Sequence, residues 1–136
     1  MRLSAVFELV LTAEPAALSL IRDRLRRWLR TYHWPDAELE GLVLAVSEAA
    51  SNVVEHAYPP GVSGDIEIDG RVNVISGGGR VAELTIRDRG RWRPIPERPE
   101  NRRRGIPLMT AAVAQLNIDG TEQGTCVRMR GPAVIW

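Results

Sequence analysis

The sequence contains no lysine, and all 18 of its basic residues are arginine. Any mechanism that needs a lysine to bind phosphate or to act as a catalytic amine is therefore excluded, which removes the P-loop and protein-kinase templates. Cysteine is nearly absent too, because Cys126 stands alone. A single cysteine cannot form an internal disulfide, and this usage is typical of proteins of the reducing cytoplasm.

Long hydrophobic runs are also missing. No stretch approaches the roughly 20 apolar residues that a membrane span requires. The apolar N-terminal stretch is interrupted by Glu8 and lacks the small-residue cleavage site of a signal peptide. A chain of 136 residues, 44% hydrophobic and 26% charged, has the composition of an ordinary globular protein. We therefore expect residues 1–136 to form one domain around one core.

The net charge is only +1, which argues against bulk attraction to nucleic acid or to a membrane. The arginines are nevertheless clustered, between Arg22 and Arg30 and again between Arg87 and Arg104. Such clusters are usually solvated surface, and anionic partners are the alternative. Direct nucleic-acid binding is disfavoured because the clusters contain few aromatic residues and no recognition-helix pattern.

Hydrophobic periodicity divides the chain into short elements. It predicts strands over about 3–11, 65–75, 81–88, 116–118 and 125–129. It predicts a helix that starts within residues 12–15 and runs to about 32, a second over about 37–57, and a third that begins at Gly105. Thr12 and Asp36 are candidate helix caps, Gly70 is a candidate bulge, and Asp119 and Gly120 are expected to form a turn. Residues 89–104 are predicted to form a long loop of the kind that often serves as a lid. This order favours an α+β fold, with one mixed, mostly antiparallel sheet covered by helices on one face.

The predicted helix that contains residues 42–58 carries two polar residues of interest. Glu48 and Asn52 are four residues apart, so on a helix their side chains lie one turn from each other. A carboxylate and a carboxamide at this spacing suit a general base beside an oxygen ligand for a hard cation. His56 continues the row by one more turn. Taken alone, the row is also consistent with the solvated face of an ordinary amphipathic helix.

Three features of the second half give this helix a possible ligand. Asp88 and Gly90 follow a strand, where a buried carboxylate can accept a hydrogen bond from an exocyclic amine and a glycine lets a flat ring approach the backbone. Gly105 precedes a helix whose first N–H groups could hold phosphate. Thr125 places a hydroxyl on a late strand. Each feature is commonplace in isolation.

In this order the motifs resemble the GHKL ATPase/kinase superfamily, most of all the bacterial anti-sigma-factor serine/threonine kinases. The phrase S-E-A-x-x-N-x-x-x-H-A-Y (residues 47–58) carries most of the resemblance, and D-x-G (88–90), R-G-I-P-L-M (104–109) and G-T (124–125) add to it. The resemblance covers nearly the whole chain. It implies a Bergerat-type ATP-binding fold, a two-layer sandwich with helices on one face of the sheet.

The resemblance also assigns roles to residues, with ATP and Mg²⁺ as cofactors. It implies that Glu48 is the catalytic base, which activates the attacking hydroxyl, and that Asn52 ligates the Mg²⁺ that bridges the ATP phosphates. Asp88 would accept from the adenine amino group, with help from Thr125 through water, and Gly90 would line the adenine pocket. The remaining positions would hold the phosphates; these are Arg104, Gly105 and Ile106.

Two departures from the family pattern concern the lid. Trp92 and Arg103 stand where the family has glycines. Because neither change touches Glu48, Asn52 or Asp88, they weaken the case for catalytic turnover more than the case for nucleotide binding.

The implied function is that of a cytoplasmic anti-sigma factor and kinase that acts by partner switching. It would phosphorylate an anti-anti-sigma protein with a STAS domain, sequester a sigma factor, and form a homodimer. The alternative is a non-catalytic module of the same fold that binds nucleotide or a partner, with or without an attached phosphatase or sensor domain. A histidine-kinase catalytic domain shares the ATP site, but we find no dimerisation helices with a phosphoacceptor histidine in this sequence.

Overall fold

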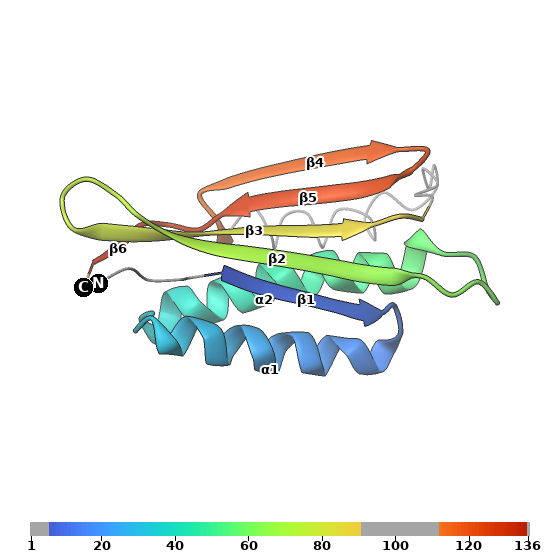
Figure 1. The fold of residues 1–136 in the computed structure, drawn as a ribbon, viewed down its shortest axis with the longest axis horizontal. Helices are drawn as coiled ribbons and strands as arrows, with labels where there is room; N and C mark the ends of the chain where they lie inside the picture. Colours follow the sequence, from blue (N-terminus) through green and yellow to red (C-terminus); the bar gives the residue numbers. More distant parts are fainter. Residues whose placement is uncertain (1–5, 91–111, 136) are drawn as a thin grey trace.

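A computed structural model describes residues 6–90 and 112–135. Two helices are packed against a sheet, and one π-helical turn (Val53–Ala57) extends the second helix (Figure 1). In chain order the elements are β1 (Val6–Thr12), α1 (Pro15–Thr31), α2 (Asp36–Asn52), the π turn, β2 (Asp65–Val74), β3 (Gly79–Asp88), β4 (Gln115–Thr121), β5 (Gly124–Arg130) and β6 (Val134–Ile135). Residues 91–104 of the predicted lid and the start of the predicted helix at Gly105 lie outside the described residues.

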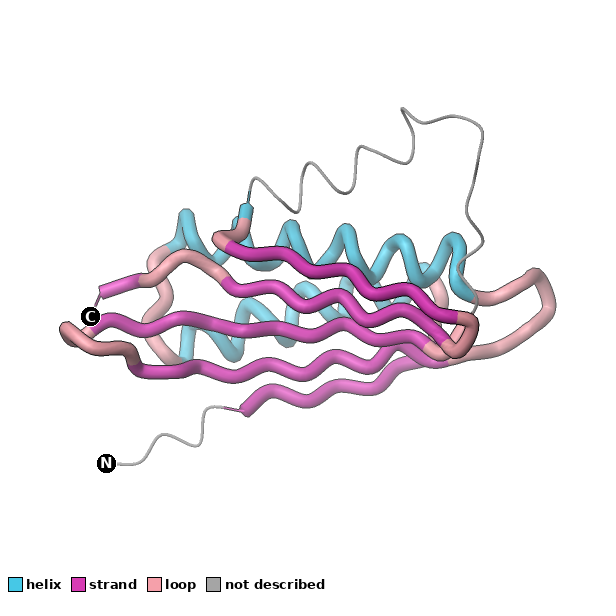
Figure 2. The backbone as a smooth tube through the Cα atoms, turned by 90° about the horizontal axis from the view of Figure 1, so that it is seen from above, coloured by secondary structure: helices cyan, strands magenta, loops and turns pink. Residues whose placement is uncertain are grey.

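The sheet has the strand order β1-β2-β3-β5-β4, and the short β6 pairs with the start of β3. Every pairing between the described strands is antiparallel. Side chains alternate along the strands, so that Phe7, Ile68 and Ile86 are buried while Glu8, Asp69 and Arg87 lie on the other face. Both helices lie on the buried side of the sheet (Figure 2). The α+β fold class expected from the sequence, a two-layer sandwich, is confirmed.

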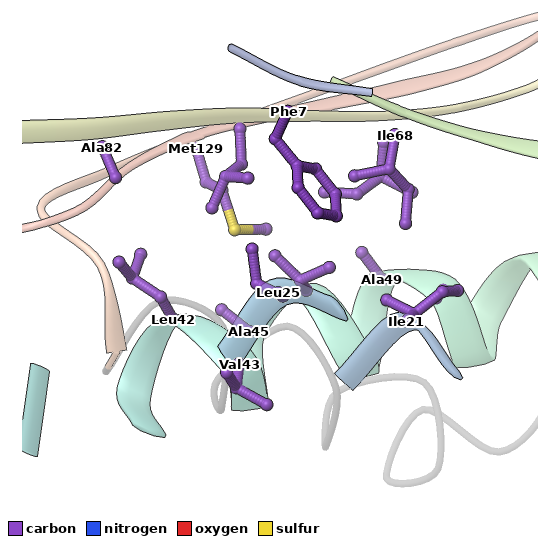
Figure 3. Packing of buried hydrophobic residues seen from close by; sticks show 14 of the residues in the cluster. Phe7, Ile21, Leu25, Leu42, Val43, Ala45, Ala49, Ile68, Ala82 and Met129 are labelled. Carbon is purple, nitrogen blue, oxygen red and sulfur yellow. The ribbon is translucent and has the colours of Figure 1, made fainter. Parts of the chain in front are cut away.

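The core lies between the sheet and the two helices (Figure 3). Ile21 and Leu25 point from α1, and Leu42, Ala45 and Ala49 point from α2, towards strand residues that include Phe7, Ile68, Ala82 and Met129. The small alanines let α2 lie close to the sheet, and the larger side chains of α1 fill the space beside it. The apolar residues of each helix recur every three or four positions, and this spacing gives each helix one buried face.

The turn between the helices is built by backbone capping and one buried arginine. His33 has a left-handed φ of 56°, and the amides of His33 and Trp34 donate to the carbonyls of Arg30 and Leu29. This is the Schellman arrangement at a helix C-terminus. Arg80 of β3 is fully buried, lies over the Trp34 ring at 4.8 Å, and donates to the carbonyl oxygens of Tyr32 (3.2 Å) and His33 (2.7 Å). Burial lowers the pKa of Arg80 below its usual value.

The structure corrects both predicted helix caps. Thr12 ends β1, and α1 starts at Pro15 with Glu14 before it and no side-chain cap. Asp36 is the first helical residue of α2, preceded by Pro35. It therefore does not cap the helix with its side chain. Its negative charge lies in the first turn, where it interacts favourably with the positive end of the helix dipole.

Two other local predictions are also wrong. Gly70 forms no bulge, because β2 pairs without interruption with β1 and β3. A Cβ atom at Gly70 would lie 2.9 to 3.1 Å from atoms of Leu84, Trp28 and Phe7, so the glycine makes room for packed side chains. Asp119 and Gly120 lie within β4, and the hairpin turns two residues later at Glu122 and Gln123.

Neither described helix is long and apolar enough to cross a membrane.

Candidate functional site

Asp88 is the last residue of β3 and is only 2% exposed. Its Oδ1 atom accepts hydrogen bonds from the backbone N–H groups of Gly90 (3.0 Å) and Thr125 (3.3 Å). Two donors from separate segments fix the direction of this carboxylate. The strand end predicted to hold a buried carboxylate therefore does so, and the carboxylate is held in one orientation.

Thr125 lies directly opposite Asp88 in the β3–β5 register and is equally buried. Among the described residues, its hydroxyl oxygen has no hydrogen-bond partner. Buried hydroxyl groups are normally satisfied, and leaving one without a partner costs free energy. A water molecule, or a ligand whose polar edge lies beside Asp88, would supply the missing hydrogen-bond partner. Asp88 and Thr125 are therefore consistent with the adenine-binding role that the family resemblance implied.

Two glycines let separate backbone segments converge on Asp88. A Cβ atom on Gly90 would lie 2.0 Å from the carbonyl oxygen of Ala57. A Cβ atom on Gly124 would lie 2.1 Å from the carbonyl oxygen of Asp88, and Gly124 also has a φ of +138°. The glycine at position 90 was expected to admit a flat ring. In the structure it admits the backbone of the π turn.

Glu48 and Asn52 are half-buried on the last turns of α2. They lie on the same side of the helix as Gly41, because positions 41, 45, 48 and 52 are separated by three or four residues. A Cβ atom on Gly41 would lie 3.6 Å from the carbonyl oxygen of Ala112. Glu48 and Asn52 therefore lie on the side of α2 that faces Ala112, the first described residue after position 90. Ser47 faces α1 instead, where Arg22 donates a hydrogen bond to its hydroxyl (3.1 Å).

The two halves of the site lie at the same end of the molecule. The C-terminal end of α2, the end of β3 and the start of β5 come together on the right in Figure 1. The contact between Gly90 and Ala57 joins them directly. Glu48 and Asn52 thus belong to the same end of the sandwich as Asp88 and Thr125.

The π turn changes the direction of His56. A π turn is wider than an α turn, so residue 56 no longer continues the row of residues 48 and 52. The His56 imidazole is exposed, and its Nε2 atom lies 3.7 Å from the carboxylate of Glu55. The structure gives it the position of a surface residue and provides no support for a part in the polar row.

A cavity of about 800 Å³ lies beside the site. It shares Ala57 and Gly90 with the site, but Glu48, Asn52, Asp88 and Thr125 do not line it. We therefore base the site on the buried carboxylate and hydroxyl. The cavity is lined by the end of the π turn and the loop that follows it, by the start of β2, and by the two residues after β3.

The predicted phosphate and metal chemistry stays a prediction. Arg104, Gly105 and Ile106 lie outside the described residues, as do Trp92 and Arg103. The described residues contain no group of three or more His, Cys, Asp or Glu side chains that could hold a metal.

Comparison with known proteins assigns the family. Residues 11–131 match the model of the histidine kinase-like ATPase domain. The chain belongs to this family, so its fold is that of an ATP-binding domain. The buried Asp88–Thr125 pair lies within the matched residues.

Solved structures show the same fold. The chain is similar to the structure of the RsbU and RsbW domains of Rv1364c from Mycobacterium tuberculosis, at 23% identity and a TM-score of 0.71 over 94% of this chain. It is also similar to two structures of the blue-light activated histidine kinase of Erythrobacter litoralis EL346, at 27% and 28% identity, each with a TM-score of 0.56 over 72% of this chain. The chain spans 32%, 46% and 31% of the lengths of those three chains.

Sequence reasoning missed one residue of this region. Tyr58 was noted only as the end of the family phrase. Its hydroxyl forms hydrogen bonds with the backbone of Asp65 at the start of β2 and of Arg89 just after β3. The signal available in the sequence was its place between the polar helix and the Pro59–Pro60 pair, where the helix must end.

Proposed function

We propose that the chain is an ATP-dependent protein serine/threonine kinase of the anti-sigma-factor type. Its substrate would be a serine or threonine hydroxyl of an anti-anti-sigma STAS protein, and it would also sequester a sigma factor. The observation that carries the nucleotide part is the buried Asp88–Thr125 pair in a domain of the histidine kinase-like ATPase family. Within the part of the chain that the structure describes, the Thr125 hydroxyl has no hydrogen-bond partner.

The kinase type is supported by the sequence and by the coverage of the structural likenesses. The phrase over residues 47–58 resembles the anti-sigma-factor kinases. The likeness to the Rv1364c domains extends over 94% of the chain, against 72% for the histidine kinases. We also propose that residues 1–136 form one domain, which the match over residues 11–131 supports.

Each candidate residue would have one task. Asp88 would accept from the purine amino group, with Thr125 contributing its hydroxyl, and Gly90 would border the base. Asn52 would ligate Mg²⁺, which neutralises phosphate charge when bound. Glu48 would take the proton from the acceptor hydroxyl as that oxygen bonds to the terminal phosphorus. The bond from this phosphorus to the bridging oxygen would break, and ADP would leave. Arg104, Gly105 and Ile106 would hold the phosphates. Phosphoryl transfer depends mainly on such positioning and charge neutralisation.

The test is phosphate transfer from labelled ATP to a STAS partner in the presence of Mg²⁺. Glu48→Ala should abolish transfer, whereas Glu38→Ala, at the other end of α2, should leave it unchanged. Undiminished transfer by Glu48→Ala would sink the role of Glu48. In calorimetry, Asn52→Ala should lose the effect of Mg²⁺ on binding, and Asp88→Asn should lose binding altogether.

A second function is favoured by Trp92 and Arg103, which replace family glycines. The chain could be a non-catalytic module that holds a regulatory partner. Capture of a STAS protein or sigma factor without ATP binding or phosphate transfer would establish it. Under either proposal a sigma-factor partner implies a cytoplasmic protein, and we propose a homodimer, which sedimentation would test. Neither proposal involves contact with a membrane or with nucleic acid.

A further inference from the structure

Tyr58 is the first residue after the π turn, and its hydroxyl joins two strands. The hydroxyl donates to the carbonyl oxygen of Asp65 at the start of β2 (2.7 Å). It also accepts from the backbone N–H of Arg89, just beyond the end of β3 (3.1 Å). A phenol has one O–H donor and can accept as well. Both capacities are used here, and both partners are backbone groups, so the bonds do not depend on the side chains at positions 65 and 89.

The Tyr58 ring packs against position 64, where only glycine leaves enough room for it. A Cβ atom on Gly64 would lie 2.0 Å from Cε1 of the ring and 2.1 Å from Cζ. The ring therefore lies directly against the Gly64 backbone. Gly64 is in turn tied to the first strand region, because Ala13 N–H donates to its carbonyl oxygen (2.8 Å). The position of the hydroxyl is set by this packing and not by the hydroxyl bonds alone.

Residues 57 and 58 contact residues 90 and 89, respectively. Ala57 touches Gly90, and Tyr58 binds the amide of Arg89. The side chain of Arg89 is held separately, because its guanidinium donates to both carboxylate oxygens of Glu67 (2.8 and 3.3 Å). This bond raises the pKa of Arg89. Both the backbone and the side chain at position 89 are therefore fixed.

Fixing Arg89 has a consequence for the buried carboxylate. The next amide, that of Gly90, is one of the two N–H donors that orient Asp88. The other donor, Thr125, comes from β5 on the opposite side. The Tyr58 hydroxyl thus lies one peptide unit from a group that decides where the Asp88 carboxylate points.

We propose that Tyr58 is a positioning residue for base recognition. Its hydroxyl holds the Arg89–Gly90 peptide so that Gly90 N–H orients Asp88, and through Asp88 it sets the preference for adenine over guanine. This inference rests on the proposed function, in which Asp88 accepts from the purine amino group. Guanine presents a carbonyl oxygen where adenine presents that amine, so a well-oriented acceptor carboxylate discriminates between them.

The experiment compares Tyr58→Phe with Tyr32→Phe, which alters the only other tyrosine and lies at the far end of the molecule. Amide hydrogen exchange is measured by NMR without nucleotide, and ATP and GTP affinities are measured by calorimetry. In Tyr58→Phe we expect the Arg89 and Gly90 amides to exchange faster by roughly fivefold, from the loss of the hydrogen bond that the Arg89 amide donates. We also expect the ratio of ATP to GTP affinity to fall by a similar factor. Tyr32→Phe should change neither quantity.

Gly64→Ala provides a second variant that leaves the hydroxyl intact but displaces the ring. It should lower the ATP-to-GTP affinity ratio as Tyr58→Phe does. A general loss of stability would weaken both nucleotides alike and would leave this ratio unchanged.

The outcomes distinguish a failure of the positioning role of Tyr58 from a failure of the proposed function. Unchanged Arg89 and Gly90 exchange in Tyr58→Phe overturns the positioning role, and so does altered exchange with an unaltered affinity ratio. If the unmodified protein binds neither nucleotide, the proposed function fails and this inference fails with it. That case is recognised because the unmodified protein is itself inactive in calorimetry, whatever the exchange data show.

Discussion

At the scale of single residues, Gly124 determines how closely β5 approaches the end of β3. Its φ of +138° is strained for any other residue, and a Cβ atom would meet the Asp88 carbonyl oxygen at 2.1 Å and Arg89 Cα at 2.8 Å. Gly124→Ala should therefore lower the free energy of unfolding by about 2–5 kcal/mol, from strain and overpacking together. Denaturant unfolding measures this, and nucleotide binding should weaken in the same variant.

Gly61→Ala is the matched control for that substitution. Gly61 also has a positive φ, +82°, but a Cβ atom there would meet nothing within 4 Å. It should cost only the backbone strain, about 1–2 kcal/mol. Equal losses in the two variants would show that the contact with Asp88 and Arg89 is unimportant.

The contrast between Asp88 and Tyr58 shows what a sequence reveals about single residues. A carboxylate between a strand and a glycine is visible as a pattern, and its burial followed from the alternation of β3. The bonds of the Tyr58 hydroxyl join residues 31 and 7 positions away. No local pattern contains that information, because the partners are chosen by how the π turn and two strands meet. Arg80 was missed for the same reason, since its acceptors lie 47 and 48 residues earlier.

At the scale of elements, α1 and α2 are joined at their surface by one ion pair. Arg26 donates two hydrogen bonds to the carboxylate of Glu40 (2.9 and 3.0 Å). The hydrogen bonds from Arg26 lower the pKa of Glu40 below its usual 4.5. The stabilisation is therefore fully present above pH 4.5 and is lost as the pH falls through the lower pKa of the folded state.

Glu40→Gln should show this dependence. The side chains of Arg26 and Glu40 are 35% and 50% exposed, so we expect a loss of only about 0.2–1 kcal/mol at pH 7. The difference from the unmodified protein should disappear near pH 3, and high salt should reduce it. Urea unfolding at both pH values measures it, with Glu8→Gln on exposed β1 as the control. A difference of the same size at pH 3 would contradict an ionic origin.

The elements themselves were predicted with unequal success. The two described helices were predicted because their apolar residues recur at helical spacing. The cap expected at Thr12 was wrong, since α1 begins at Pro15. The turn between β4 and β5 was misplaced because Asp119–Gly120 has strong local turn propensity. Tertiary pairing overrides that propensity: Thr121 bonds to Gln123 N–H and to the Gly124 carbonyl, which places the turn after Thr121. Gly70 was misread for a similar reason, because Trp28 of α1 occupies the space above it.

At the scale of the whole molecule, the strand order could not be derived from periodicity. The pattern gives strands and their buried faces, but it does not say that β5 lies between β3 and β4, or that residues 134–135 return to pair with β3. The fold class followed from the order of elements and from the family resemblance. The order of the strands is what brings Thr125 opposite Asp88.

This convergence makes ligand binding a property of the whole fold. Asp88 from β3, Thr125 from β5 and Ala57 from the π turn meet at one place, and Gly64 links that place to the end of β1. A ligand bound there holds together segments that separate when the chain unfolds. Binding to the folded state alone should therefore stabilise the protein by about 2.7 kcal/mol at a ligand concentration of 100 Kd.

For a domain of this size that stabilisation corresponds to a rise in Tm of about 10 °C. We expect ATP with Mg²⁺ to produce this rise in the unmodified protein, and GTP at the same concentration to produce much less. Asn52→Ala should keep the part of the rise that ATP gives without Mg²⁺, because its task concerns the metal. Asp88→Asn should show no rise, since the base loses its acceptor. A full rise in Asp88→Asn would mean that the nucleotide binds elsewhere, and the cavity bordered by Tyr58 and Arg89 would then be the place to search.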